Sequence, residues 1–108
     1  MNIRSIMPVE GQLLRIEAIV DAVASVWGIE PEIIFGRSRR QPIAFARQLC
    51  MALAYKKTHL SLCQVGECFD NRDHTTVVYA IKKVDQASTN KDVRPLIQEV
   101  ITKLKPAA

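Results

Sequence analysis

The chain has 108 residues, of which 48% are hydrophobic and 6% aromatic, and its formal net charge is +4. This length suits one compact soluble domain, and the few aromatic residues and four glycines favour a helical bundle over a β-sandwich. No run approaches the roughly 20 consecutive apolar residues of a membrane span, and the N-terminus lacks the apolar stretch of a secretory signal.

Two helices are predicted in the first third of the chain. The first follows Pro8 and runs to Trp27, because apolar residues recur there at helical spacing until Gly28 interrupts them. The second is short and covers residues 31–35, since proline suits its first position and Gly36 ends it.

A basic loop, residues 37–41, leads into a third helix that begins at Pro42 and reaches about Lys57. One face of this helix is apolar and predicted to be buried (Phe45, Leu49, Ala52 and Leu53). The opposite face is polar and predicted to be exposed, and it carries Arg47, Gln48 and Tyr55.

Two further helices form a helix-turn-helix pattern. Ser61 followed by Gln64 is a capping box that opens a helix through Cys68 and Phe69. Asp73 is a plausible cap for the next helix, residues 74–87, and the tight polar connection between the two is typical of a helix-turn-helix. A last helix, at about residues 90–105, presents an apolar face that closes the core (Val93, Leu96, Ile97, Val100, Ile101 and Leu104).

Charge is concentrated in the middle of the chain. Residues 33–66 contain six basic side chains and no acidic one, whereas residues 1–32 contain two basic and five acidic ones, and residues 67–108 contain seven basic and six acidic ones. A basic segment between acidic or balanced flanks indicates a surface for a polyanion such as a nucleic acid.

The second helix of a helix-turn-helix lies in the major groove of DNA, and its first residues touch base edges. Here these residues are His74, Thr75 and Thr76. A threonine methyl group packs on thymine, and hydroxyl and imidazole groups bond to bases or phosphates. Asp73 either caps the helix or accepts a hydrogen bond from cytosine. The alternative for the whole stretch is a polar, solvated first turn.

Other basic and polar residues suit the DNA backbone. Arg47 and Gln48 are able to bond to phosphate, and an arginine of the 37–41 loop suits a narrow minor groove. Lys82 and its neighbour Lys83 either reach a phosphate or are solvated surface lysines.

Four blocks in this order resemble the C-terminal DNA-binding domain of DnaA, the bacterial chromosomal replication initiator: Gly36-Arg-Ser-Arg-Arg, Ala46-Arg-Gln, Leu60-Ser-Leu with Val65-Gly and Phe69, and Arg72-Asp-His-Thr-Thr-Val. The likeness covers about residues 16–86. It implies an all-α bundle of five or six helices with a Trp-repressor-like helix-turn-helix. It also implies roles for particular residues: Asp73, His74, Thr75 and Thr76 in the major groove, Arg39 in the minor groove, and Arg47, Gln48, Thr58, Leu62 and Cys63 at the DNA backbone.

The chain departs from the family pattern at four positions. Asp70 and Asn71 replace two glycines, but both tolerate a left-handed conformation, so the turn is expected to survive. Cys63 stands where proline is usual, and Tyr55 stands where a lysine often provides a phosphate contact.

The ATPase core of a replication initiator has no counterpart, because no Gly-x-x-x-x-Gly-Lys-Ser/Thr loop is present. The chain is therefore either an excised domain or a small stand-alone protein, and Met1 with the leader before Ile16 favours the latter. As a stand-alone protein, it is expected to occupy DnaA-box-like sites and to regulate replication or transcription.

Three alternatives remain. His59, Cys63, Cys68 and His74 are metal-ligand types, but two of them point to different faces of a predicted helix. A Cys–His pair lacks a third orienting group for catalysis. The helix-turn-helix is also compatible with a protein-interaction module that binds an acidic partner. The prediction is a monomeric, cytoplasmic, nucleoid-associated DNA-binding domain spanning residues 1–108, with double-stranded DNA as partner, no cofactor or metal, no enzymatic activity and three reduced cysteines.

Overall fold

A computed structural model describes the backbone of residues 10–104 and the side chains from Arg15 onward; the predicted helix start at Pro8 lies outside this range. The described residues form six helices and no strand, which confirms the all-helical prediction. In chain order these are α1 (Glu10–Trp27), α2 (Pro31–Phe35), α3 (Ile43–Lys57), α4 (Leu62–Cys68), α5 (His74–Ala87) and α6 (Arg94–Leu104).

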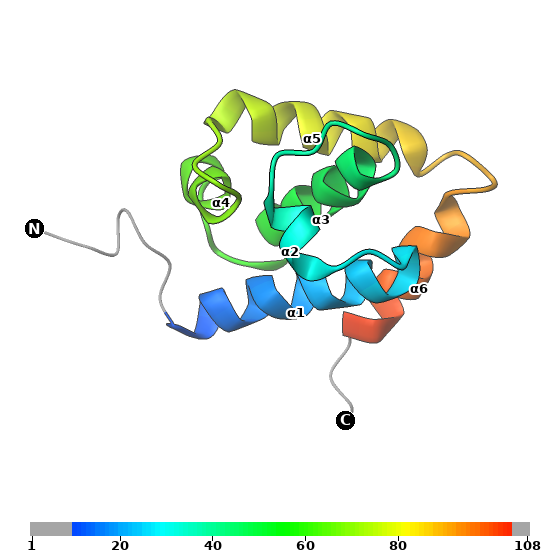
Figure 1. Cartoon of the computed structure of the whole chain (residues 1–108), viewed down its shortest axis with the longest axis horizontal. Coiled ribbons are helices and arrows are strands. Elements are labelled where there is room, and N and C mark those ends of the chain that lie inside the picture. Colours follow the sequence, from blue (N-terminus) through cyan, green and yellow to red (C-terminus); the bar gives the residue numbers. More distant parts are fainter. Residues whose placement is uncertain (1–9, 105–108) are drawn as a thin grey trace, which may run out of the picture.

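Helix α3 lies at the centre of the fold, between α1 and α5 (Figure 1). It contacts α1, α2, α4 and α5, and α6 packs against α1. Its middle part is buried nearly all round, so the predicted division of α3 into an apolar face and an opposite polar face describes only its ends. Tyr55, near the last turn, is exposed as predicted.

Local sequence signals set most helix ends. Gly28 adopts a left-handed conformation (φ 69°) after α1, where glycine carries no steric penalty. Pro31 starts α2, and the amide of Gly36 closes it by donating to Ile33 O. Pro42 is the N-cap of α3, one residue before the helix begins. These ends agree with the predicted ones to within a residue.

One hydrophobic core joins the helices. Val77 and Val84 of α5 are buried, and Ile81 is partly buried against the same core. In α6 the buried residues are Ile97 and Val100, whereas the prediction that Leu96 faces the core is wrong, because Leu96 is exposed. Among residues 10–104, none of the helices has the length and apolar character needed to cross a bilayer.

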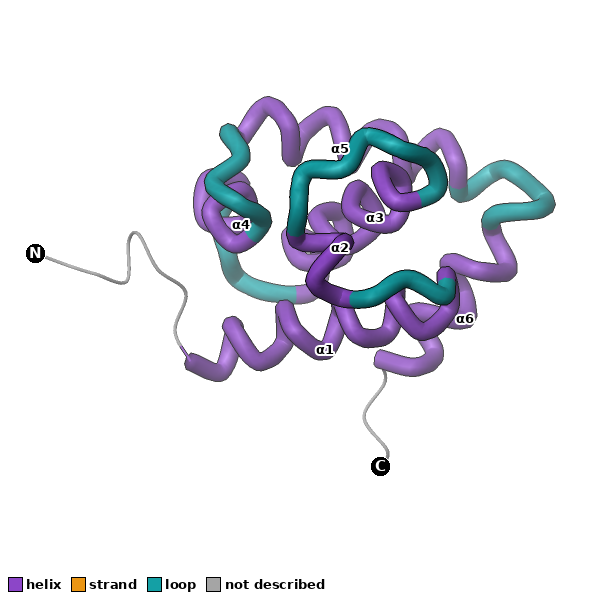
Figure 2. The backbone as a smooth tube through the Cα atoms, viewed as in Figure 1, coloured by secondary structure: helices purple, strands orange, loops and turns teal. Residues whose placement is uncertain are grey.

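Two loops place the chemically interesting side chains (Figure 2). The loop between α2 and α3, residues 36–42, rises towards α5, and the turn between α4 and α5, residues 69–73, lies at the same end of the molecule. Segments more than 30 residues apart in the sequence therefore meet beside the first turn of α5, where the predicted DNA-reading residues lie.

Candidate nucleic-acid interface

The helix-turn-helix is formed by α4, a tight turn and α5. The capping box predicted for α4 is confirmed: Ser61 Oγ accepts from the amide of Gln64 (3.1 Å), and the amide of Ser61 donates to Gln64 Oε1 (2.9 Å). In the turn, Asp70 and Asn71 have φ angles of 65° and 54°. The prediction that these residues tolerate the left-handed conformation is therefore confirmed, and the turn forms without the family's two glycines.

Gly66 allows the two helices to approach closely. The amide of Arg72 donates to Gly66 O (2.8 Å), and a Cβ atom built on Gly66 would collide with the carbonyl group of Arg72. Only glycine leaves room for the turn to pass over α4 at this point. The position of α5 relative to α4 thus depends on one residue without a side chain.

Asp73 is the N-cap of α5, as predicted. Its carboxylate accepts hydrogen bonds from the amide of Thr75 (2.7 Å) and from the Thr75 hydroxyl (2.6 Å). These hydrogen bonds lower the pKa of the Asp73 carboxyl group, so it is ionised at neutral pH and complements the positive end of the helix. His74 and Thr75 are exposed, and Thr76 is half-buried.

Arg47 does not lie on an exposed polar face, and that prediction is wrong. Its side chain is 5% exposed and donates to Ile34 O (2.7 Å), Ser38 O (2.7 Å) and Ile33 O (3.4 Å). A planar guanidinium group with five donors suits such a cluster of carbonyl groups. Arg47 therefore ties the end of α2 and the start of the 36–42 loop to α3.

The same loop segment is also tied to the helix-turn-helix. Arg37 donates from Nε to the Asp70 carboxylate (2.6 Å) and from Nη2 to Asp70 O (2.8 Å). Arg72 donates from Nη2 to Gly36 O (2.7 Å). The sequence-based prediction missed these contacts of Arg37 and Arg72, although an acidic residue in a position that usually holds glycine was a usable signal for Asp70.

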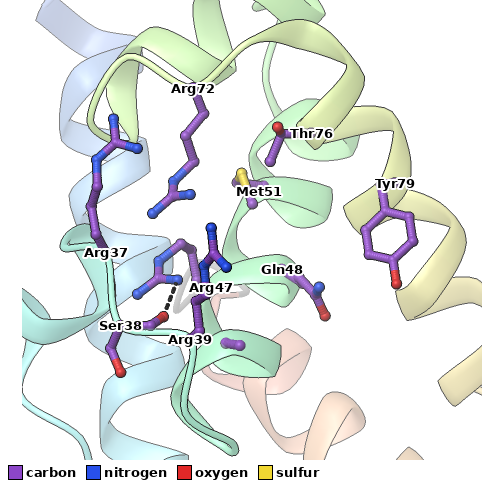
Figure 3. Close-up of a pocket in the computed structure, with 10 residues that line it drawn as sticks. Arg37, Ser38, Arg39, Arg47, Gln48, Met51, Arg72, Thr76 and Tyr79 are labelled. Carbon is purple, nitrogen blue, oxygen red and sulfur yellow. Dashed lines mark hydrogen bonds between the residues drawn. The ribbon is translucent and has the colours of Figure 1, made fainter.

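A cleft of about 230 Å³ lies between the loop, α3 and α5 (Figure 3). Four arginines and no acidic residue line it, together with Gln48, Thr76 and Tyr79; the arginines are Arg37, Arg39, Arg47 and Arg72. Burial, followed by the charge of neighbouring arginines, lowers the pKa of both Arg47 and Arg72. The buried Nε of Arg72 has no acceptor among the described residues, so the cleft offers both excess positive charge and a spare donor to an anion.

The remaining predicted site residues are spread around the helix-turn-helix. The Thr58 hydroxyl donates to Ala54 O (2.6 Å) and accepts from the amide of Leu60 (3.1 Å), so it closes the end of α3. Leu62 packs partly against the core, and Lys82 is exposed on α5. Cys63 is exposed at the start of α4 and lines a second shallow cleft with Asp73 and His74. Tyr79, which was not among the predicted site residues, is exposed one turn after Thr75.

The residue types considered for a metal or catalytic site are not grouped in one place. Within residues 15–104, no three His, Cys, Asp or Glu side chains form a cluster able to hold a metal ion. Cys50 is a buried core residue, and burial raises the pKa of its thiol; burial likewise raises the pKa of the half-buried Cys68. A protonated thiol is a poor nucleophile, so neither side chain has the properties of an activated cysteine.

Comparison with known proteins identifies the family. A model described as the bacterial DnaA protein helix-turn-helix matches residues 16–84. The chain is 34% identical over 103 residues to the chromosomal replication initiator protein DnaA of Thermodesulfovibrio yellowstonii, which is 94% of the chain and 24% of that protein. It is 40% identical over 93 residues to DnaA of Gloeobacter violaceus (85% and 21%) and 40% identical over 81 residues to DnaA of Thermus thermophilus (74% and 19%).

The chain thus spans no more than about a quarter of the length of these curated relatives. The matched residues run from Ile16 in α1 to Val84 in α5 and include the whole helix-turn, the start of the recognition helix, the 36–42 loop and the arginine-lined cleft. The chain belongs to the bacterial DnaA helix-turn-helix family.

Proposed function

We propose that this protein binds double-stranded DNA sequence-specifically, at sites resembling the DnaA box, and acts in the initiation of replication or its regulation. The observation that carries the proposal is the juxtaposition of the exposed first turn of α5 with a cleft lined by four arginines and no acidic residue. A recognition helix needs base-reading side chains beside a positively charged surface for the phosphates. Membership of the DnaA helix-turn-helix family supports the same assignment.

Each part of the interface has a proposed role. His74, Thr75 and Thr76 read base edges in the major groove, and Asp73 fixes their orientation by capping the helix. Arg39, exposed in the 36–42 loop, enters the minor groove. Side chains bordering these two readers contact the sugar–phosphate backbone: Gln48, Thr58, Leu62, Cys63 and Lys82. Arg47 acts indirectly, by holding the loop.

The biological role follows from what the chain contains. Its sequence has no phosphate-binding loop, so its own residues supply DNA binding and no ATP hydrolysis. A chain of this kind that occupies DnaA-box-like sites competes with a full-length initiator for them. Its effect on replication or transcription would then depend on which sites it occupies.

The division of roles is tested with three variants. His74→Ala and Thr76→Val should each relax the preference at one base pair by about 1–3 kcal/mol while leaving binding to random DNA nearly unchanged. Lys82→Ala should weaken binding to all duplexes alike and reduce the slope of log affinity against log salt by about one unit. Affinities are measured for a DnaA-box duplex and its single-base variants at several salt concentrations.

Lys103→Ala is the matched control, because it removes one exposed lysine from α6, which packs on α1 away from the helix-turn-helix. It should leave both the preference and the salt slope as in the unmodified protein. The assignment of roles is wrong if the His74, Thr76 and Lys82 variants change binding in the same way.

A further inference from the structure

Three hydrogen bonds join the 36–42 loop to the turn between α4 and α5. They run from Arg37 to the carboxylate and the carbonyl oxygen of Asp70 (2.6 and 2.8 Å), and from Arg72 to Gly36 O (2.7 Å). We call these four residues the loop–turn clamp. The clamp connects residues 33 or more positions apart, so it fixes the relative position of two segments that the chain itself does not hold together.

The clamp lies directly beside both proposed DNA readers. Arg39 follows Arg37 by two residues, and α5 begins at His74, four residues after Asp70. A reader of the minor groove and a reader of the major groove must meet the same duplex at one fixed spacing. Holding that spacing in the free protein reduces the conformational entropy lost on binding, which strengthens specific complexes.

Asp70 contributes a group that glycine, the usual family residue, does not have. Glycine at this position would still offer the carbonyl oxygen to Arg37, but not the carboxylate. The left-handed φ of 65° places Asp70 where an aspartate is accepted. The carboxylate is thus an extra restraint on the loop, carried by this chain's own residue.

A negative charge beside a basic surface has a second effect, of opposite sign. Asp70 and Arg37 are 49% and 64% exposed, so the carboxylate is close enough to solvent to repel a DNA phosphate. If charge were its only effect, removing the carboxylate would strengthen binding to every duplex and leave selectivity unchanged. A positioning role predicts a loss of selectivity instead.

The geometry points to Asp70 as a positioning residue for DNA recognition: it holds Arg37, and through it the 36–42 loop, at the spacing from α5 that lets the minor and major grooves be read together. The inference rests on the proposed function, since it concerns how the two readers cooperate. Asp70 itself touches no base in this account.

The test uses Asp70→Asn, which removes the charge, keeps nearly the same shape and tolerates the left-handed conformation. Asp85→Asn is the matched control, because Asp85 forms an ion pair of similar exposure with Lys56 (2.9 Å) that links α5 to α3 and takes no part in the clamp. Both variants change the net charge by the same amount.

The DNA probes isolate the minor groove. A·T pairs at the edge of a DnaA-box duplex are replaced by I·C or by G·C, two pairs that differ only in the amino group of guanine in the minor groove. The unmodified protein should prefer the I·C duplexes. Asp70→Asn should reduce this preference about two- to fivefold, the range of an exposed ion pair. Its affinity for a scrambled duplex should stay equal or rise, while Asp85→Asn should keep the preference.

A double-mutant cycle with Arg37→Gln completes the test. Since Arg37 and Asp70 act through one contact, the second substitution should add little to the loss of preference caused by the first. Amide hydrogen exchange in the free protein gives a readout without DNA: the amide of Arg40, which donates to Ser38 Oγ (3.2 Å), should exchange faster in Asp70→Asn than in Asp85→Asn.

Two results would overturn the inference: equal I·C preference in the two Asp→Asn variants, or additive effects of Arg37→Gln and Asp70→Asn on that preference. Failure of the proposed function looks different, since the unmodified protein would then bind the DnaA-box duplex no better than the scrambled one. In that case the positioning role for DNA reading fails with it.

Discussion

Replacing Gly66 with alanine is expected to lower the free energy of unfolding by about 3 kcal/mol. The added Cβ would collide with the carbonyl group of Arg72, and the turn cannot move away without losing the hydrogen bond from Arg72 N to Gly66 O (2.8 Å). The better helix propensity of alanine offsets only about 1 kcal/mol of this cost. Chemical denaturation monitored by circular dichroism measures the change.

Gly36→Ala serves as the control for this substitution. Gly36 has a φ of −79°, and the nearest atom to a Cβ built there is Ile33 O at 3.5 Å, an ordinary contact. Its effect on the free energy of unfolding should stay within about 0.5 kcal/mol. A Gly66→Ala protein as stable as the Gly36→Ala protein would show that the close approach of the turn to α4 is not a constraint on the fold.

Arg47→Ala is expected to have the second-largest effect, a loss of about 2–3 kcal/mol in the free energy of unfolding. The substitution leaves the carbonyl groups of Ile33, Ile34 and Ser38 without their shared donor, and the bond to Ile34 O is buried. Hydrogen bonds from a charged group contribute more than neutral ones, and a buried acceptor without a partner carries a desolvation penalty. Thermal and urea denaturation both report this loss.

Arg47→Ala should also weaken DNA binding, at a temperature where the variant remains folded, because the 36–42 loop loses its anchor on α3. The salt slope should stay as in the unmodified protein, since Arg47 is proposed to touch no phosphate. A slope smaller by about one unit would instead show a direct phosphate contact. Arg40→Ala, which removes an exposed loop arginine, is the control and should leave stability nearly unchanged.

The helix boundaries were predictable because local chemistry sets them. Pro31 and Gly36 delimit α2, Ser61 with Gln64 caps α4, and Asp73 caps α5, each through groups only a few residues apart. The left-handed turn was predictable for the same reason, since the φ preference of Asp70 and Asn71 belongs to the residues themselves.

The burial of Arg47 was not predictable from helical periodicity. A one-dimensional pattern assigns a charged residue to the solvent face, whereas here a long side chain reaches three carbonyl groups 9 to 14 residues earlier in the chain. The pairing of Arg37 with Asp70 spans 33 residues, and it too depends on how α2, α3 and the turn pack together. Local signals therefore identified the elements of the candidate site but not the contacts that join them.

The central claim is that the first turn of α5 and the adjacent basic surface recognise a particular DNA sequence. The most direct test is a fluorescence-anisotropy titration of the protein against a DnaA-box duplex and a scrambled duplex of equal length, at two salt concentrations. We expect the DnaA-box duplex to bind about a thousandfold more tightly or better, with the preference retained at the higher salt concentration. Equal binding to both duplexes, weakening together as salt rises, would contradict specific recognition and leave only a basic surface.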